Sequence, residues 1–176
     1  MDLGPVDRIT ADAVGEPGAR TFYLQARAGG DVVTIIVEKE QVQLLAASVL
    51  ELLEDVVGDD LVSDEDTMGL EEPFEARWRA GRLSLAFDGD RDLFLLEIEE
   101  FRPDLEDLDA EDPRSLLPDE EPETLRVWAS AAQMLSLSRY GAAVAARGRP
   151  TCQFCGNPID PEGHACPAMN GHSRLA

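Results

Sequence analysis

The sequence TFYLQARAGGDVVTIIV occupies residues 21–37 and sets the expectation for the fold. Residues 21–27 are rich in aromatic and apolar side chains, and residues 32–37 are largely β-branched, as is typical of strands. Gly29-Gly30-Asp31 lies between them and is a tight-turn signal. The stretch therefore predicts a β-hairpin.

The spacing of apolar residues changes directly after this hairpin. Residues 40–57 carry apolar side chains at steps of three or four, which predicts an amphipathic helix ending near Gly58. The apolar positions are Val42, Leu45, Val49, Leu52, Leu53 and Val56.

A second block of strands is predicted over residues 74–98. Apolar and charged residues alternate in 74–78, Ala80-Gly81 indicates a turn, and 83–87 alternates again. Residues 93–98 form a third, more apolar strand. Phe22 with Arg27-Ala28-Gly29 recurs 52 residues later as Phe74 with Arg79-Ala80-Gly81, so either a duplicated hairpin or a chance match is present.

An acidic stretch follows. Residues 97–123 contain thirteen acidic residues and four prolines, which oppose packing and predict a partly mobile loop at about 100–122. Glu121-Pro122-Glu123-Thr124 is typical of a helix start, and the predicted helix spans 123–147.

The sequence has one constellation of residues with recognisable chemistry. Cys152-x-x-Cys155-Gly156 is a zinc-knuckle pattern, in which two thiolates reach one ion and the glycine closes the turn. His164 and Cys166 follow nine and eleven residues after Cys155 and complete a Cys₃His set. The predicted metal ligands are therefore Cys152, Cys155, His164 and Cys166, and the predicted cofactor is a structural Zn²⁺ ion.

Three alternatives to this ligand set remain. His172 could replace His164, the pair Cys152 and Cys155 could form a redox switch, or the thiols could be reduced and unliganded. A catalytic zinc ion is disfavoured because such sites usually keep an open fourth position, and three thiolates make the ion less Lewis-acidic.

Together these features predict an α+β fold. We expect an antiparallel sheet of about five strands in two hairpin-based blocks, with the two main helices packed on one face. Residues 1–147 would form this domain, and residues 148–176 would form a small C-terminal zinc-binding module.

The net charge of −21 limits the possible partners. A chain this acidic repels nucleic-acid backbones and anionic membrane surfaces. Residues 1–10 lack the apolar core of a secretory signal, and no apolar run reaches the ~20 residues that span a bilayer. We expect a cytoplasmic protein with a protein partner, and the oligomeric state stays open.

No catalytic residues are predicted. Both histidines of the sequence lie near the cysteines, and no Gly-rich phosphate loop or nucleophile motif is present.

A basic patch could be formed by Arg77, Arg79 and Arg82, although pairing with acidic neighbours is the simpler expectation. Residues 15–20 could line a ligand cleft or form an ordinary loop before the first strand. Trp78 and Trp128 are expected in the core.

Several stretches resemble an uncharacterised, largely actinobacterial family of conserved proteins, some labelled repeat proteins of unknown function. The resemblance rests on residues 15–26 and 38–42, and above all on Gly148-Arg149-Pro150-x-Cys152-x-x-Cys155-Gly156 and Asp160-Pro161-Glu162-Gly163-His164-x-Cys166-Pro167. It implies an accessory role beside histidine-phosphatase-like and kinase-like proteins encoded nearby, and it supplies no catalytic residues.

Two hypotheses on function follow. The first is a non-enzymatic interaction or accessory protein with structural zinc. The alternative is a small-molecule enzyme, a hydrolase or transferase, that uses the metal site or an arginine-lined cleft.

Overall fold

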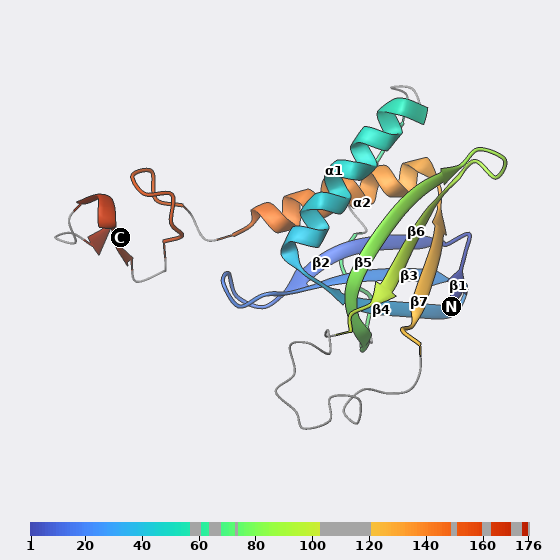
Figure 1. Ribbon diagram of the computed structural model, residues 1–176, viewed down its shortest axis with the longest axis horizontal. Helices are drawn as coiled ribbons and strands as arrows, with labels where there is room; N and C mark the ends of the chain where they lie inside the picture. Colours follow the sequence, from blue (N-terminus) through green and yellow to red (C-terminus); the bar gives the residue numbers. More distant parts are fainter. Residues whose placement is uncertain are drawn as a thin grey trace.

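The computed structural model describes residues 1–56, 61–63, 68–72, 74–102, 121–148, 151–159, 163–169 and 174–175. Within these residues, a seven-stranded sheet and two α-helices form the body of the protein (Figure 1). The strands are β1 (Asp2–Leu3), β2 (Arg8–Val14), β3 (Thr21–Ala28), β4 (Asp31–Val37), β5 (Ala76–Asp88), β6 (Leu93–Glu100) and β7 (Thr124–Ala129). The helices are α1 (Lys39–Val56) and α2 (Ala131–Ala146).

The sheet joins two three-stranded meanders. β2, β3 and β4 pair antiparallel, and so do β5, β6 and β7. β4 and β5 pair parallel because α1 connects them by crossing over the sheet. β1 pairs parallel with β7, which gives the order β1-β7-β6-β5-β4-β3-β2. Figure 1 shows β5, β6 and β7 running steeply across the direction of β2, β3 and β4, so the sheet is strongly twisted.

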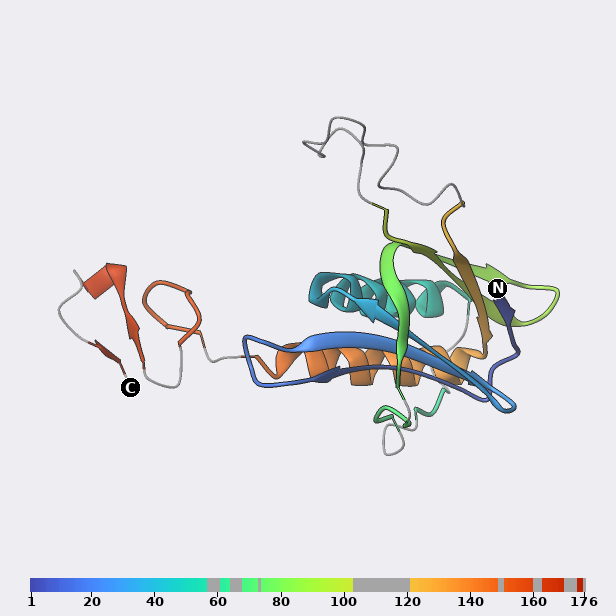
Figure 2. The same ribbon diagram turned by 90° about the horizontal axis from the view of Figure 1, so that it is seen from below.

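Both helices lie on one side of this sheet, and α2 runs alongside β2 (Figures 1 and 2). Gly141 allows the close approach, because a Cβ there would lie 3.2 Å from Cγ1 of Val42 in α1 and 3.5 Å from Cβ of Ala11 in β2. The Ser138 hydroxyl donates a hydrogen bond of 2.7 Å to the Ala46 carbonyl and ties α2 to α1. The largest fully buried side chains include Ile9, Leu24, Ile35, Phe94, Leu96, Ile98, Leu125 and Met134.

The opposite face of β5, β6 and β7 carries cross-strand ion pairs. Arg82 Nε lies 3.1 Å from Glu99 Oε2, and Arg126 Nε lies 2.6 Å from Glu97 Oε2. These residues are direct neighbours in the strand register. The predicted pairing of Arg82 with an acidic neighbour is therefore confirmed, and exposed pairs of this kind contribute little to stability.

The Gln25 side chain holds a loop segment against the outer face of β3. Its amide nitrogen donates to Thr34 Oγ1 and to the Glu71 carbonyl, both at 3.0 Å, and its oxygen accepts from the Glu71 backbone nitrogen at 2.8 Å. Gln25 is 1% exposed, so these bonds satisfy its buried amide. The side chain thus pairs with the backbone of residue 71 as a neighbouring strand would.

We expect Gln25→Ala to lower the free energy of unfolding by about 1–3 kcal/mol, because buried partners of the amide lose their hydrogen bonds. Chemical denaturation measures the loss, and hydrogen exchange should show faster exchange at Glu71. Gln43→Ala on the exposed face of α1 is the control. Equal effects of the two substitutions would contradict this role for Gln25.

The prediction of about five antiparallel strands was wrong in number and direction. β2 was missed because residues 15–20 were interpreted as a loop before the first strand, whereas they connect β2 to β3. β1 is two residues long and has no sequence signal of its own. The two parallel pairings arise from the crossover by α1 and from the return of the N-terminus to β7, which local patterns do not encode.

The turn predicted at Ala80-Gly81 is also corrected. Residues 76–88 form one strand, and the register with β6 shifts between Ala80 and Arg82. A Cβ at Gly81 would lie 2.9 Å from the Phe101 Cα, so glycine permits the close approach of two backbones at this bulge. An offset of 52 residues places β3 (Thr21–Ala28) against residues 73–80, which include the start of β5. The order of elements repeats differently, as β2-β3-β4-α1 and then β5-β6-β7-α2, in which β3 corresponds to β6.

The helix predicted over 123–147 divides into β7 and α2. Leu125, Val127 and Ala129 are buried in alternation, which is a strand pattern. α2 starts after Ser130, whose side chain accepts from the Gln133 backbone while the Gln133 side chain accepts from the Ser130 backbone. This capping box, Ser-x-x-Gln, was the available sequence signal.

The helix predicted over 40–57 is confirmed as α1, with Val42, Leu45, Val49 and Leu53 buried. Its expected end at Gly58 and most of the acidic loop at 100–122 fall outside the described residues. Among the described helices, none combines the length and apolarity needed to cross a membrane.

The two tryptophans differ in their surroundings. Trp78 is half-buried against the core, as expected, whereas Trp128 lies on the outer face of the sheet, with the guanidinium carbon of Arg91 4.5 Å from its ring centroid.

Candidate metal centre

The first half of the cluster is a closed loop around Cys152 and Cys155. Thr151 and Pro158 form a β-bridge at its base, and the Cys152 nitrogen donates to the Asn157 carbonyl at 2.8 Å. The Gly156 nitrogen donates to the Cys152 carbonyl at 2.8 Å, with a φ of 74° at Gly156. A positive φ favours glycine, so the sequence Cys-x-x-Cys-Gly folds here as the knuckle predicted.

The second half comes from a short strand pair. His164 belongs to β8 (His164–Ala165), which pairs antiparallel with β9 (Arg174–Leu175), and Cys166 follows directly. Residues two apart in extended chain point to the same side, so the His-x-Cys spacing can direct both side chains at one point. The chain then enters a 3₁₀ turn, η3 (Pro167–Met169).

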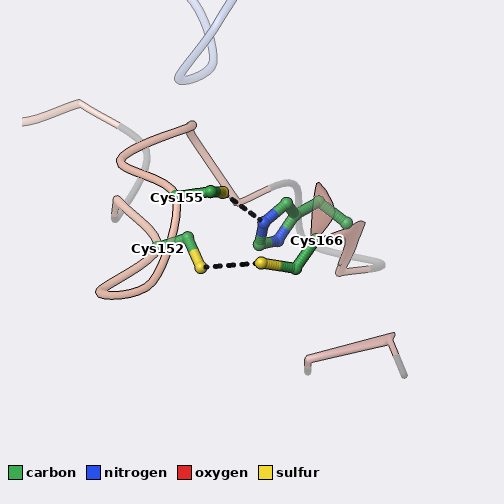
Figure 3. Close-up of side chains that lie close together, drawn as sticks. Cys152, Cys155 and Cys166 are labelled. Carbon is green, nitrogen blue, oxygen red and sulfur yellow. Dashed lines mark hydrogen bonds between the residues drawn. The ribbon is translucent and has the colours of Figure 1, made fainter. Parts of the chain in front are cut away.

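The four side chains converge on one another. Their ligand atoms all lie within 4.8 Å of each other. Sγ of Cys152 lies 3.7 Å from Sγ of Cys166, and Sγ of Cys155 lies 3.4 Å from Nε2 of His164 (Figure 3). A tetrahedral zinc ion with ordinary bond lengths requires S–S and S–N separations of about 3.8 and about 3.5 Å. The two separations match these values, and the remaining ones stay within 4.8 Å, so the cluster could hold one metal ion, with Nε2 as the imidazole nitrogen nearest to a thiol.

The environment of these atoms also suits a metal. Cys152 and Cys166 are buried, while Cys155 and His164 are half-buried. Nδ1 of His164 is buried and has no hydrogen-bond partner within the described part of the chain. Nε2 is therefore the nitrogen of this imidazole that faces the thiols, and it is the one placed to bind an ion.

The pKa of the Cys152 thiol is lowered to about 7. Burial alone would raise this pKa, but hydrogen bonds from the backbone at Phe154 and Cys155 and from the neighbouring thiols outweigh it. For Cys155, the backbone at Asn157 lowers the pKa, while burial and the other two thiols raise it and prevail. Near neutral pH, one thiol of the cluster thus ionises readily, and the thiolate is the form that binds metals.

The predicted site residues are found together. Cys152, Cys155, His164 and Cys166 form one cluster that could hold a metal ion. The alternative ligand His172 lies outside the described residues. The arginines of β5 do not act as one patch: Arg79 pairs with Glu38 at the start of α1, and Arg82 pairs with Glu99 in β6.

Comparison with known families covers almost the whole chain. Residues 1–166 match the model of a family described as Protein of unknown function (DUF3090). The chain belongs to the DUF3090 family. The match ends on Cys166, so the four clustered residues of this DUF3090 protein lie inside the matched range and His172 lies outside it. No curated protein and no solved structure matches the chain.

The resemblance to an uncharacterised family is confirmed by this match. The description of the DUF3090 family names no activity, so function must be argued from the residues themselves. In the part of the chain that the structure describes, the Cys/His cluster is the only group of three or more such residues placed to hold an ion.

Proposed function

We propose that the cluster binds one structural zinc ion and that the protein is a non-enzymatic accessory or interaction protein. The observation that carries the proposal is the convergence of four protein ligand atoms, all within 4.8 Å of one another and with two of their separations at the values expected around a zinc ion. Catalytic zinc sites usually keep one position for water or substrate, whereas structural sites fill all four positions from the protein. Soft thiolate ligands favour zinc over magnesium or calcium.

An exposed aromatic side chain supports the interaction role. Phe154 lies between the two knuckle cysteines and is 54% exposed. Aromatic residues of this kind are enriched among interface anchors. Free cysteines at the cluster suit a reducing compartment, so the proposal places the protein in the cytoplasm.

Metal content and X-ray absorption test the zinc site. We expect one zinc ion per chain in the purified native protein, with three sulfur ligands and one nitrogen ligand. A water or oxygen in the first shell would favour the enzyme hypothesis instead. A metal-free protein would leave the redox switch at Cys152 and Cys155 as the alternative.

Substituting the two histidines separately distinguishes the possible ligand sets. We expect His164→Ala to lower zinc affinity at least about 100-fold, because the ion loses one of four ligands. His172→Ala should leave the affinity unchanged. A competition titration with a chromophoric chelator measures both constants, and the reverse pattern would assign the fourth ligand to His172.

The interaction role has its own test. The zinc-loaded chain should retain a stoichiometric protein partner from native lysate, and Phe154→Ala should weaken this retention. Phe101→Ala removes a ring of similar exposure, 52%, from the residue that follows β6 and is the matched control. Failure to recover any stoichiometric partner would count against the proposal.

The enzyme alternative retains one supporting observation, the basic pocket beside Arg79 described below. A hydrolase or transferase would need convergent polar groups there that act on the bound molecule. Turnover of a phosphate ester by the native protein, lost in Arg79→Gln, would establish it.

A further inference from the structure

A pocket of about 400 Å³ lies where several elements of the body meet. It is lined by the residues around the start of β3, the end of β4, the start of α1 and Arg79 of β5. Gly148, Thr151 and Pro158 contribute from the C-terminal segment, and the last two form the bridge at the base of the knuckle.

The charge of this pocket is opposite to that of the chain as a whole. Arg20, Lys39 and Arg79 line it together with one acidic residue, Glu38. The chain carries a net charge of −21, whereas these four side chains sum to +2. Three cations repel one another, so gathering them in one hollow costs free energy unless an anion compensates it.

The partners of these cations leave most donors available. Arg20 Nη1 donates to the Val144 carbonyl at 3.2 Å while its guanidinium lies over the Phe22 ring, 5.4 Å from the centroid. Arg79 Nη1 donates to Glu38 Oε1. A guanidinium has five N–H donors, so one such bond does not exhaust either arginine. Within the described part of the chain, the Lys39 ammonium forms no ion pair, although it lies close to Gly148.

The rest of the lining suits an organic group. Ile36 contributes apolar surface together with the edges of the buried Phe22 and Val37, and the volume exceeds what one inorganic oxyanion fills. A phosphate monoester carries about −1.5 to −2 charges at neutral pH, which matches the net charge of the four side chains. Arginine forks and a lysine point charge are the usual groups that bind such an ester.

We propose that this pocket binds a small phosphate monoester, with the phosphate held by Arg20, Lys39 and Arg79 and the organic group against Phe22, Ile36 and Val37. The acidic surface elsewhere repels long polyanions, so the ligand is a small molecule and not a nucleic acid. The sequence did not indicate Lys39 as a ligand-binding residue, because a charged pair such as Glu38-Lys39 is common where a helix begins.

Isothermal titration of the full-length native chain with glycerol 3-phosphate tests the site. We expect saturable one-to-one binding, with no binding of glycerol and at least about tenfold weaker binding of lactate at the same ionic strength. Inorganic phosphate should bind more weakly than the ester because it leaves the apolar lining uncovered. Equal affinity for lactate, or inorganic phosphate binding as tightly as the ester, would overturn the assignment to a phosphate monoester.

Single substitutions inside and outside the pocket distinguish the loss of a ligand contact from damage to the fold. Arg79→Gln and Lys39→Gln should each weaken binding by about tenfold or more, since each removes a charged contact. Glu38→Gln should strengthen binding, because it removes the carboxylate that competes for Arg79. Arg82→Gln, on the same strand but paired with Glu99 outside the pocket, should change nothing.

Absence of binding by the native chain would overturn the proposal and leave Arg20 as a partner of the α2 carboxyl end and Arg79 as a partner of Glu38. Unchanged affinity in Arg79→Gln and Lys39→Gln would also overturn it, by placing the ester elsewhere. The three cations that hold the phosphate come from the body of the protein, so the titration tests the phosphate contacts and the metal analysis tests the zinc site by separate measurements.

Discussion

Replacing Cys166 by serine is expected to abolish zinc binding and to unfold the C-terminal segment while the sheet stays folded. Cys166 and Cys152 are the buried side chains among the described residues after 148, so this segment has almost no apolar core. Structural zinc contributes about 10–16 kcal/mol of apparent binding free energy in comparable small modules, and that energy drives their folding. Loss of one thiolate therefore removes most of what orders the segment.

Elemental analysis and hydrogen exchange measure this result. We expect zinc to fall from one ion per chain to none, with loss of protection at residues 151–159 and 163–166. β6 and α2 should remain protected, because the hydrophobic core of the body includes neither cysteine. Gln153→Ser, at an exposed position of the same loop, is the control. A Cys166→Ser chain that keeps its zinc and its protection would contradict the assignment.

Phe94→Ala is expected to produce the largest loss of stability in the body of the protein. Phe94 lies in β6, between β5 and β7, is 0% exposed, and its ring centroid is 5.0 Å from that of Phe87. Truncating a fully buried phenylalanine costs about 3–5 kcal/mol through lost transfer free energy and a residual cavity. Guanidinium denaturation followed by circular dichroism measures the change.

Phe101→Ala serves as the control for this substitution, since its side chain is 52% exposed and should cost less than about 1 kcal/mol. Zinc content should be unchanged in both variants. A similar loss in the two variants would mean that Phe94 is not the centre of the core. Loss of zinc in Phe94→Ala would mean that the C-terminal segment depends on the sheet for its order.

The sequence located those features whose causes are local. The hairpin over residues 21–37 follows from β-branched runs around Gly29-Gly30, and α1 follows from apolar residues at helical spacing. The knuckle was found for the same reason. Cys152 and Cys155 lie one tight turn apart, so their spacing alone requires the two thiols to be neighbours.

The errors arose where two local signals competed. Glu121-Pro122-Glu123 favours a helix start, but Leu125, Val127 and Ala129 bury one face against the core, and tertiary burial outweighs the weak helix preference. At Gly81, glycine marks a bulge with close backbone contact instead of a turn. Only the neighbouring strand and the Phe101 backbone distinguish these possibilities.

By itself, the sequence determined the α+β class, the first hairpin, α1 and the residue types of the metal cluster, because each depends on contacts within a few residues. The tertiary structure decided the strand order, the parallel pairs and the convergence of His164 and Cys166 on the knuckle. It also brought Arg20, Lys39 and Arg79 to one pocket from three separate elements. Contacts between distant residues depend on how the whole chain packs, and no local pattern records that packing.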